Sequence, residues 1–278
     1  MKFAVIGKNG QLASCLKEVA PKGFDICFYG SHEVDITRSD TYEPLASSDL
    51  IINCSAYTAV DKAEEFPEDA FAINRMGVIQ LVELCERHQI KLIHFSTDFV
   101  FSGEELAPYN ENHFTGPKSV YGASKLAGEE IILQSTLSAL VIRTSWLYSP
   151  YGHNFCKTML KLGSERSEVS VVADQIGTPT SALDLSRAVF EIIEMGLSKK
   201  PELLHISNTG QCSWADFARE IFKQKGISVT VNDTTTEAFN APAKRPKYSV
   251  LSTEKLLFRF GIPMRPWKEA LSEVLIRL

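Results

Sequence analysis

The chain has 278 residues, of which 44% are hydrophobic and 23% charged, and its formal net charge is −5. This composition suits a globular protein of one or two domains, and the acidic balance argues against nucleic acid or an anionic membrane as a partner. The six cysteines show no CxxC pair and no Cys/His cluster with zinc spacing, and no apolar run is long enough to span a bilayer. We therefore expect reduced thiols, no structural metal and a cytoplasmic location.

Short apolar runs alternate with helical patterns through the first half of the chain. The runs KFAVIG, DICFYG, DLIINCSA, IKLIHFST and ALVIRTSWLY predict strands, and apolar residues at helical spacing predict helices over 10–20, 63–88 and 120–135. Strands and helices in this alternation form a parallel sheet covered on both faces, joined by right-handed crossovers. The sequence therefore predicts an α/β protein with a doubly wound parallel sheet of the Rossmann type.

The second half continues with strands at VSVVAD and LLHISN and helices over 184–197 and 213–226. Ser213 and Gly226 suit the two caps of the last of these helices. The proline-containing stretch 232–267 is predicted to form loops with short helices. We predict a cofactor-binding domain over 1–150, completed by about 181–208, and a smaller, mainly substrate-binding C-terminal lobe over 151–278, with more than one crossing between them.

A glycine loop, GKNGQLA, directly follows the first predicted strand and opens the first helix. Glycines in such a loop let the backbone approach a pyrophosphate, and the helix N-terminus supplies N–H groups. At the end of the second strand, FYGSHE carries no carboxylate to grip a ribose 2′-hydroxyl, and Asp35 comes only later. Ser31 and His32 could tolerate a 2′-phosphate, so we expect NADPH as the cofactor, with NADH also accepted.

Polar side chains follow the fourth predicted strand, where STD (96–98) precedes a loop and the stretch SVYGASKLAGEE. Tyr121 and Lys125 lie one helical turn apart on one face. A nearby ammonium favours phenolate, so we expect Lys125 to lower the pKa of the tyrosine towards neutrality. Alone, YxxxK is more often an ordinary helix face. Together with Thr97 and the glycine loop, it indicates proton transfer to a carbonyl oxygen.

These motifs together resemble the extended short-chain dehydrogenase/reductase superfamily, and within it the dTDP-4-dehydrorhamnose reductases. The matching stretches occur in order along nearly the whole chain: GKNGQLA, NCSAYTAVDKAE, FSTDFVFSG, VYGASKLAGE, RTSWLY, NFCKTML, DQIGTPT, SWADFA and RPKYSVL. The resemblance implies hydride transfer from NAD(P)H to the C4 ketone of a nucleotide-linked 4-keto-6-deoxy sugar. The implied reaction converts dTDP-4-dehydro-L-rhamnose to dTDP-L-rhamnose.

The resemblance also implies roles for individual residues. Thr97, Tyr121 and Lys125 match the catalytic set, and Asp98 and Trp146 match positions that contact the substrate. Residues expected to bind the cofactor are Gly7, Gly10, Gln11, Leu12, Asp35, Ile36, Ala56, Tyr57, Thr58, Phe95, Tyr121 and Lys125.

Two further sites leave alternatives open. Trp146 follows a strand end, where an exposed ring could pack against a sugar, but it could equally be a core tryptophan. Arg245, with neighbouring lysines in AKRPKYSVL, could bind the substrate diphosphate bidentately, or it could belong to a solvated basic loop.

One departure and two rival functions remain open. Family members carry a glutamate soon after the glycine loop, implicated in magnesium binding at a dimer interface, where this chain has Cys15. Magnesium and a homodimer are therefore in doubt. The rivals are a sugar-nucleotide 4-ketoreductase with another product, of the talose or dihydrostreptose type, and a non-catalytic regulatory subunit like the β subunit of methionine adenosyltransferase.

Overall fold

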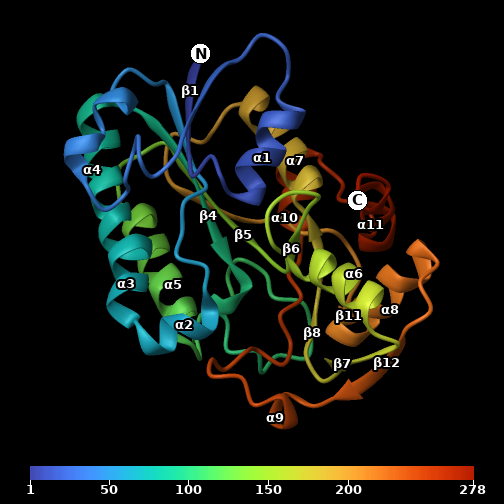
Figure 1. Ribbon diagram of the computed structural model, residues 1–278. Coiled ribbons are helices and arrows are strands. Elements are labelled where there is room, and N and C mark those ends of the chain that lie inside the picture. Colours follow the sequence, from blue (N-terminus) through green and yellow to red (C-terminus); the bar gives the residue numbers. More distant parts are fainter.

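The computed structural model describes residues 1–278, and a six-stranded parallel sheet lies at its centre (Figure 1). The strand order is β10-β5-β4-β3-β1-β2. The strands are β1 (Lys2–Ile6), β2 (Asp25–Tyr29), β3 (Leu50–Asn53), β4 (Lys91–Thr97), β5 (Ala139–Thr144) and β10 (Glu202–His205). Because β1 lies between β2 and β3, the chain order reverses there, which creates the switch point where open α/β sheets bind ligands.

Helices cover both faces of this sheet. They are α1 (Gln11–Val19), α7 (Ala182–Met195), α2 (Val60–Glu65), α3 (Pro67–Phe71), α4 (Gly77–His88) and α5 (Val120–Leu133). Figure 1 shows α1 and α7 on one side of the sheet and α3, α4 and α5 on the other. Alternate residues of β1 enter two different cores, Phe3 and Val5 the first, Ala4 and Ile6 the second. The predicted doubly wound fold is confirmed.

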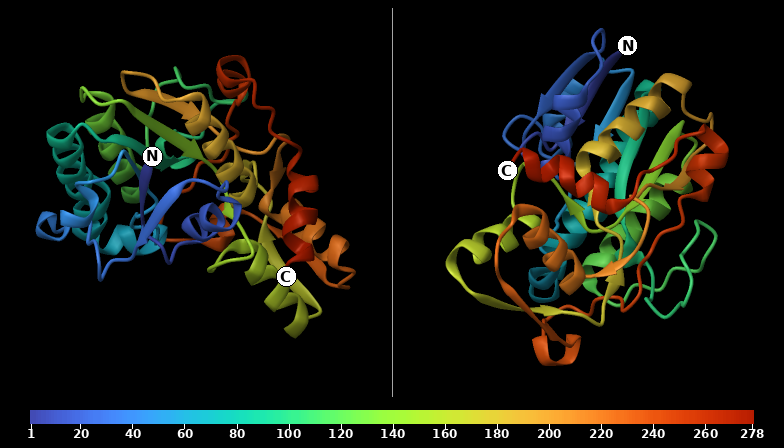
Figure 2. Two further views of the ribbon diagram at one scale, coloured as in Figure 1. Left: turned by 90° about the horizontal axis from the view of Figure 1, so that it is seen from above. Right: turned by 90° about the vertical axis from the view of Figure 1, so that its right-hand side faces the viewer.

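The remaining elements gather mainly at one end of the molecule (Figure 2). They include three two-stranded pairings: β6 (Leu147–Tyr148) with β9 (Thr180–Ser181), β7 (Glu168–Val172) with β12 (Thr230–Thr234), and β8 (Ile176–Gly177) with β11 (Cys212–Ser213). The helices are α6 (Phe155–Glu165), α8 (Trp214–Lys225), α9 (Thr236–Phe239), α10 (Glu254–Phe260) and α11 (Trp267–Ile276). The chain returns to the central sheet for β10, which pairs with β5.

The boundary between the two predicted domains stays a prediction. None of the helices combines the length and apolar character needed to cross a bilayer.

The predicted helix over 213–226 is confirmed as α8, whereas the one predicted over 63–88 is not continuous. Ser213 and Asp216 form a capping box at the start of α8, and Gly226 ends it in a left-handed conformation, as predicted. The single helix predicted over 63–88 is wrong, because the chain breaks at Phe66, restarts at Pro67 and passes through a π-helical turn at Ala72–Met76 before α4. Short 3₁₀ turns, Ser39–Thr41, Glu43–Leu45 and Asp98–Val100 (η4), complete the fold.

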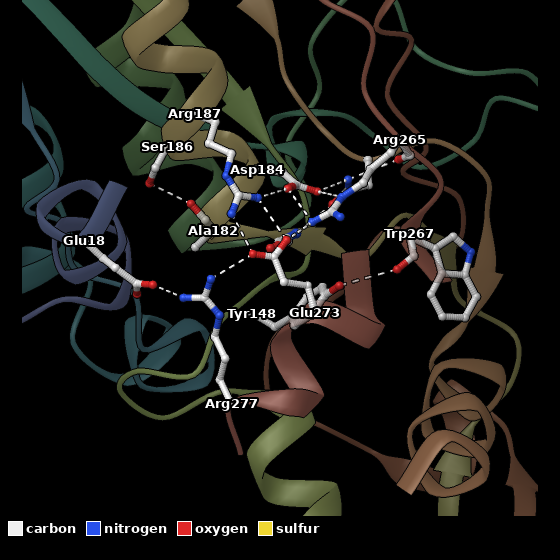
Figure 3. Close-up of polar contacts among 12 residues, drawn as sticks. Glu18, Tyr148, Ala182, Asp184, Ser186, Arg187, Arg265, Trp267, Glu273 and Arg277 are labelled. Atoms are coloured by element: carbon white, nitrogen blue, oxygen red, sulfur yellow. Dashed lines mark hydrogen bonds and ion pairs between the residues drawn. The ribbon is translucent and has the colours of Figure 1, made fainter. Parts of the chain in front are cut away.

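A network of arginine–carboxylate pairs ties the C-terminal helix α11 to α1 and α7 (Figure 3). Glu273 of α11 accepts hydrogen bonds from Arg187 at 2.6 and 3.0 Å, from Arg277 at 2.8 Å and from Arg265. Asp184 of α7 binds Arg187 at 2.9 Å and Arg265 at 2.7 and 2.8 Å, and Arg277 also pairs with Glu18 of α1. Three carboxylates therefore share three guanidinium groups.

Glu273→Gln is expected to destabilise the fold by about 1–3 kcal/mol at neutral pH. Hydrogen bonding to Arg187, followed by that to Arg265, lowers the pKa of Glu273 to about 2. A lowered folded-state pKa stabilises the protein above the ordinary glutamate value, and this contribution is lost as the pH falls through that value towards about 2.

Urea unfolding of both proteins at several pH values tests this. The difference between wild type and Glu273→Gln should be largest at neutral pH and shrink in acid. Glu269→Gln on the exposed face of the same helix is the matched control and should change little. A difference that does not depend on pH would contradict the assignment.

Candidate active site

A cavity of about 1170 Å³ lies at the carboxyl ends of β1, β3, β4 and β5. Its walls come from the turns that follow these strands, from α5, and from Trp214 and Arg245 of the second half of the chain. The sequence-predicted site residues that line it are Gly7, Gly10, Gln11, Leu12, Asp35, Ile36, Ala56, Thr58, Phe95, Thr97, Asp98, Tyr121, Lys125, Trp146 and Arg245. Tyr57 is the one predicted site residue that does not line it.

The glycine loop forms one wall and fits an anionic ligand. Gly7 has a φ of +91°, and a Cβ there would lie 2.9 Å from the backbone nitrogen of Ser55, so only glycine suits the position. Gly10 caps α1 without a side-chain hydrogen bond, and the first turn of α1 carries no acidic residue. The N–H groups at this helix start are therefore available to a pyrophosphate, as nicotinamide dinucleotide binding requires.

The side chain of Gln11 turns towards the second half of the chain. Its Nε2 donates to the carbonyl of Leu147 at 3.2 Å, and its Oε1 accepts from the Ser149 hydroxyl at 3.2 Å. These bonds hold the segment after β5 against the glycine loop, so the loop shapes two sides of the cavity.

Lys8 of the glycine loop places a cation beside the end of β2, which the order of residues in the sequence did not reveal. Lys8 pairs with Glu33, and its Cε would lie 3.2 Å from a Cβ built on Gly30. Glu33 also accepts a hydrogen bond from the Gly30 backbone at 2.8 Å. A cation therefore reaches the end of β2 from the glycine loop, near Ser31 and His32, which the sequence predicts to tolerate a 2′-phosphate.

Asn74, in the π-helical turn before α4, fixes the wall formed by 56–58. Its Oδ1 accepts from the Tyr57 backbone N–H at 2.9 Å, and its Nδ2 donates to the Tyr57 carbonyl at 3.1 Å. Nδ2 also donates to the Ser124 hydroxyl of α5 at 2.9 Å. Sequence reasoning missed Asn74, because a helical pattern does not reveal a π turn.

Small residues allow α5 to approach the end of β4 closely. Ser119 caps the helix by accepting a hydrogen bond from the Gly122 backbone at 3.1 Å. A Cβ on Gly122 would lie only 2.3 Å from the carbonyl oxygen of Phe99 in η4, and one on Gly128 only 2.3 Å from that of Asn74. The glycines of SVYGASKLAG therefore bring Tyr121 and Lys125 to the cavity wall.

The electrostatics of Tyr121 differ from the sequence expectation. Burial raises its pKa to about 12, the Asp98 carboxylate raises it too, and only the Thr97 side chain lowers it. Lys125 was expected to lower this pKa, but it is not among the groups that shift it. A raised pKa keeps the phenol protonated at neutral pH, which is the form that a proton donor needs.

Thr97 and Asp98 form a second polar group beside the phenol. The Thr97 hydroxyl donates to Asp98 Oδ1 at 3.0 Å and accepts from the Phe99 backbone N–H at 3.2 Å. Asp98 is buried, which raises its pKa to about 6, although the Ser249 and Thr97 side chains lower it, and its Oδ2 makes no hydrogen bond. A buried, unpartnered acceptor at a cavity wall calls for a donor from a ligand.

Comparison with known proteins assigns the family. The family model for the RmlD substrate binding domain matches residues 1–278. A dTDP-4-dehydrorhamnose reductase of Sinorhizobium fredii is 42% identical over 97% of this chain and 95% of that protein. The chain belongs to the dTDP-4-dehydrorhamnose reductase family. The resemblance drawn from the motifs is confirmed.

Solved structures of this family share the fold throughout. The crystal structure of a dTDP-4-dehydrorhamnose reductase from Bacillus anthracis in complex with NADP has a TM-score of 0.95 and 38% identity, covering 100% of both chains. A probable dTDP-4,6-dihydroxy-2-methyloxan-3-one 4-ketoreductase of Streptomyces antibioticus is also 35% identical over 98% of this chain and 94% of that protein. Relatives at this level of sequence identity are therefore named for more than one reaction.

Trp146 is half-buried, which lies between the exposed ring and the core tryptophan that the sequence left open. It stacks on Trp214, with ring centroids 3.5 Å apart and planes 6° apart, and a Cβ on Gly177 would lie 2.5 Å from its Cε2. Its φ of +45° is a strained value for an aromatic residue. Trp146 and Trp214 both line the cavity, so this family member presents a paired indole wall.

Arg245 is neither a solvated residue nor an unpaired cation. Its Nη1 and Nη2 donate to the two carboxylate oxygens of Asp61 in α2 at 2.9 and 2.7 Å. Both residues line the cavity. The pair joins the second half of the chain to the cofactor side of the cavity, and Arg245 keeps further donors of its guanidinium for a ligand.

The residues present do not fit the magnesium site that the family resemblance implies. Cys15 is buried in α1, which raises its thiol pKa to about 11, and Arg187 and Arg277 are the charged groups that act on it. The nearby carboxylates, Glu18 and Glu273, are already paired with arginines (Figure 3). No group of three or more His, Cys, Asp or Glu side chains is arranged to hold a metal ion.

Proposed function

We propose that this protein reduces the C4 ketone of dTDP-4-dehydro-L-rhamnose to give dTDP-L-rhamnose, with NADPH as the preferred cofactor. The observation that carries the proposal is the convergence of Thr97, Tyr121 and Lys125 on the cavity that the glycine loop also lines. The B. anthracis relative, 38% identical, was crystallised with NADP, and its fold supports the same cofactor here.

A reduced nicotinamide bound in the cavity supplies the hydride. The N–H groups at the start of α1 bind the pyrophosphate, and Lys125 holds the nicotinamide ribose. Tyr121 donates its phenolic proton to the C4 oxygen as negative charge develops there. Thr97 turns its hydroxyl proton from Asp98 Oδ1 to donate a hydrogen bond to the same oxygen. Asp98 Oδ2 accepts a hydrogen bond from a sugar hydroxyl, which satisfies its unpartnered oxygen.

NADPH oxidation by the purified protein tests this function. We expect oxidation that depends on dTDP-4-dehydro-L-rhamnose, with slower oxidation of NADH. Activity would exclude the regulatory-subunit alternative. No oxidation with this or any other dTDP-linked 4-keto sugar would overturn the proposal. A product other than dTDP-L-rhamnose would instead support the alternative 4-ketoreductases.

Arg245→Ala is expected to raise the KM for the nucleotide sugar about ten- to hundredfold, with a smaller effect on kcat. Removing a charge-assisted hydrogen bond to a diphosphate costs about 1.5–3 kcal/mol, and about 1.4 kcal/mol corresponds to tenfold. Steady-state kinetics at saturating NADPH measure this. Lys244→Ala, an exposed neighbour outside the cavity wall, is the control. An unchanged KM in Arg245→Ala would show that Arg245 does not bind the diphosphate and only pairs with Asp61.

We also infer a cofactor domain over 1–150, completed by about 181–208, and a substrate lobe over 151–278. The return of the chain to the sheet at β10 supports this division. A cytoplasmic location and a homodimer remain predictions.

A further inference from the structure

His94, in the middle of β4, connects Lys125 to the end of β3. The imidazole is 1% exposed, and Lys125 is 2% exposed. His94 Nε2 lies 3.2 Å from Lys125 Nζ, and His94 Nδ1 lies 3.0 Å from Asn53 Nδ2. Neither His94 nor Asn53 has a role in the reaction derived above, although Asn53 lines the cavity.

The orientation of the Asn53 amide follows from Ser55. The Ser55 backbone N–H donates to Asn53 Oδ1 at 3.0 Å, and the Ser55 hydroxyl donates to the same atom at 2.6 Å. A backbone N–H can only donate, so the atom facing Ser55 is the amide oxygen. The amide nitrogen, which can only donate, therefore faces His94.

This orientation determines where His94 carries its proton. Asn53 Nδ2 donates to His94 Nδ1, so Nδ1 accepts and a neutral imidazole carries its proton on Nε2. An Nε2–H facing Lys125 Nζ forms a hydrogen bond only if that nitrogen offers a lone pair. An ammonium has none. All the polar groups of this array are thus satisfied when Lys125 is a neutral amine.

The surroundings of Lys125 shift its pKa in opposite directions. Glu129, one turn along α5, favours the ammonium form, but its carboxylate is shared with Arg143 of β5. Burial favours the neutral amine and lowers the Lys125 pKa to about 8. It also lowers that of His94, so the ring remains neutral. At the cavity wall, Tyr121 is protonated at neutral pH, and Asp98 is the other titratable group.

We propose that Asn53 and His94 are positioning residues that shift the proton equilibrium of Lys125 towards its neutral amine in the ligand-free protein. Protonation of Lys125 then costs a hydrogen bond in the chain that runs from Ser55 through Asn53 and His94 to Lys125. The lost bond is either the one between His94 and Lys125 or the one that Ser55 donates to Asn53. Lys125 therefore loses its proton more readily than a free lysine, while burial keeps the Tyr121 phenol protonated in either state of Lys125. The inference rests on the proposed function only for the place of Lys125 in the reaction.

The tautomer of His94 can be observed directly. In the ligand-free full-length protein labelled with ¹⁵N-histidine, the His94 signals are assigned by their loss in His94→Gln. We expect Nε2 to be protonated and Nδ1 unprotonated above about pH 8, where Lys125 is mainly the neutral amine. A proton on Nδ1 in the wild type at that pH would overturn the proposal, whatever the variants do.

Asn53→Asp tests the coupling to Lys125. The introduced carboxylate can accept from Ser55 and from His94 Nδ1–H together, so His94 should lose its proton from Nε2 and accept from a Lys125 ammonium. We expect the Lys125 pKa, followed by the ¹³Cε shift, to rise by about one pH unit, the equivalent of one hydrogen bond. A proton retained on Nε2, or an unchanged Lys125 titration, would contradict the coupling.

Asn9→Asp is the matched control, because it adds the same charge to the same cavity without contacting His94. It should leave the His94 tautomer unchanged. A wild-type protein with the expected tautomer but no keto-sugar reduction would refute the proposed function alone. Activity with the opposite tautomer would refute this inference alone.

Discussion

Tyr121→Phe is expected to lower kcat by about 10²- to 10⁴-fold while leaving the Kd for NADPH nearly unchanged. The variant removes the proton donor and retains the ring, which packs edge-on against Phe99 with centroids 5.6 Å apart. Without the hydroxyl, the developing alkoxide must take its proton from water. Thr97 and the glycine loop remain, so binding and part of the oxyanion stabilisation persist.

Stopped-flow single turnovers together with fluorescence titration of NADPH separate chemistry from binding. Tyr57→Phe is the matched control, because Tyr57 binds Asn74 only through its backbone and does not line the cavity. Near-native turnover of Tyr121→Phe would remove Tyr121 from the mechanism. A comparable loss in Tyr57→Phe would show that the effect is structural.

Glu129→Leu is expected to lower the free energy of unfolding by about 3–5 kcal/mol, the usual cost of leaving one member of a buried ion pair alone. Glu129 and Arg143 are 0% and 3% exposed, and three hydrogen bonds of 2.6–3.1 Å join them. The variant leaves the guanidinium buried over the Phe101 ring with no carboxylate. This is a large fraction of the stability of an ordinary domain.

The double variant Glu129→Leu with Arg143→Met distinguishes lost charge pairing from lost packing. Urea unfolding should show that the second substitution recovers most of the stability, because two apolar side chains of similar volume replace the pair. A Glu129→Leu variant within about 1 kcal/mol of the wild type would contradict the account. No recovery in the double variant would assign the loss to packing.

The sheet and the glycine loop could be predicted because their signals are local. Each core strand is a short apolar run that ends in a glycine or a polar residue, and Ser213 and Gly226 cap α8 through contacts a few residues apart. The cavity at the carboxyl ends of the strands follows from the topology itself.

Features that depend on distant contacts could not be predicted. Trp146 stacks on Trp214, and Arg245 pairs with Asp61, partners that no spacing rule connects. The stretch 232–267, predicted as loops with short helices, begins inside β12, because the partner strand β7 lies some sixty residues earlier.

The direction in which the Tyr121 pKa shifts also depends on distant contacts. Spacing places an ammonium near the phenol, but the burial that raises the pKa arises from the packing of α5 against η4 and β4. A sequence motif can therefore indicate which groups react without giving their proton states.

Deuterium transfer from cofactor to sugar tests the central claim most directly. The purified chain is incubated with dTDP-4-dehydro-L-rhamnose and NADPH that carries deuterium at the transferable C4 position, and the sugar is then analysed by NMR. We predict dTDP-L-rhamnose with one deuterium at C4 of the sugar for each NADP⁺ formed. Cofactor oxidation without deuterium at that carbon, or no oxidation at all, would contradict the account.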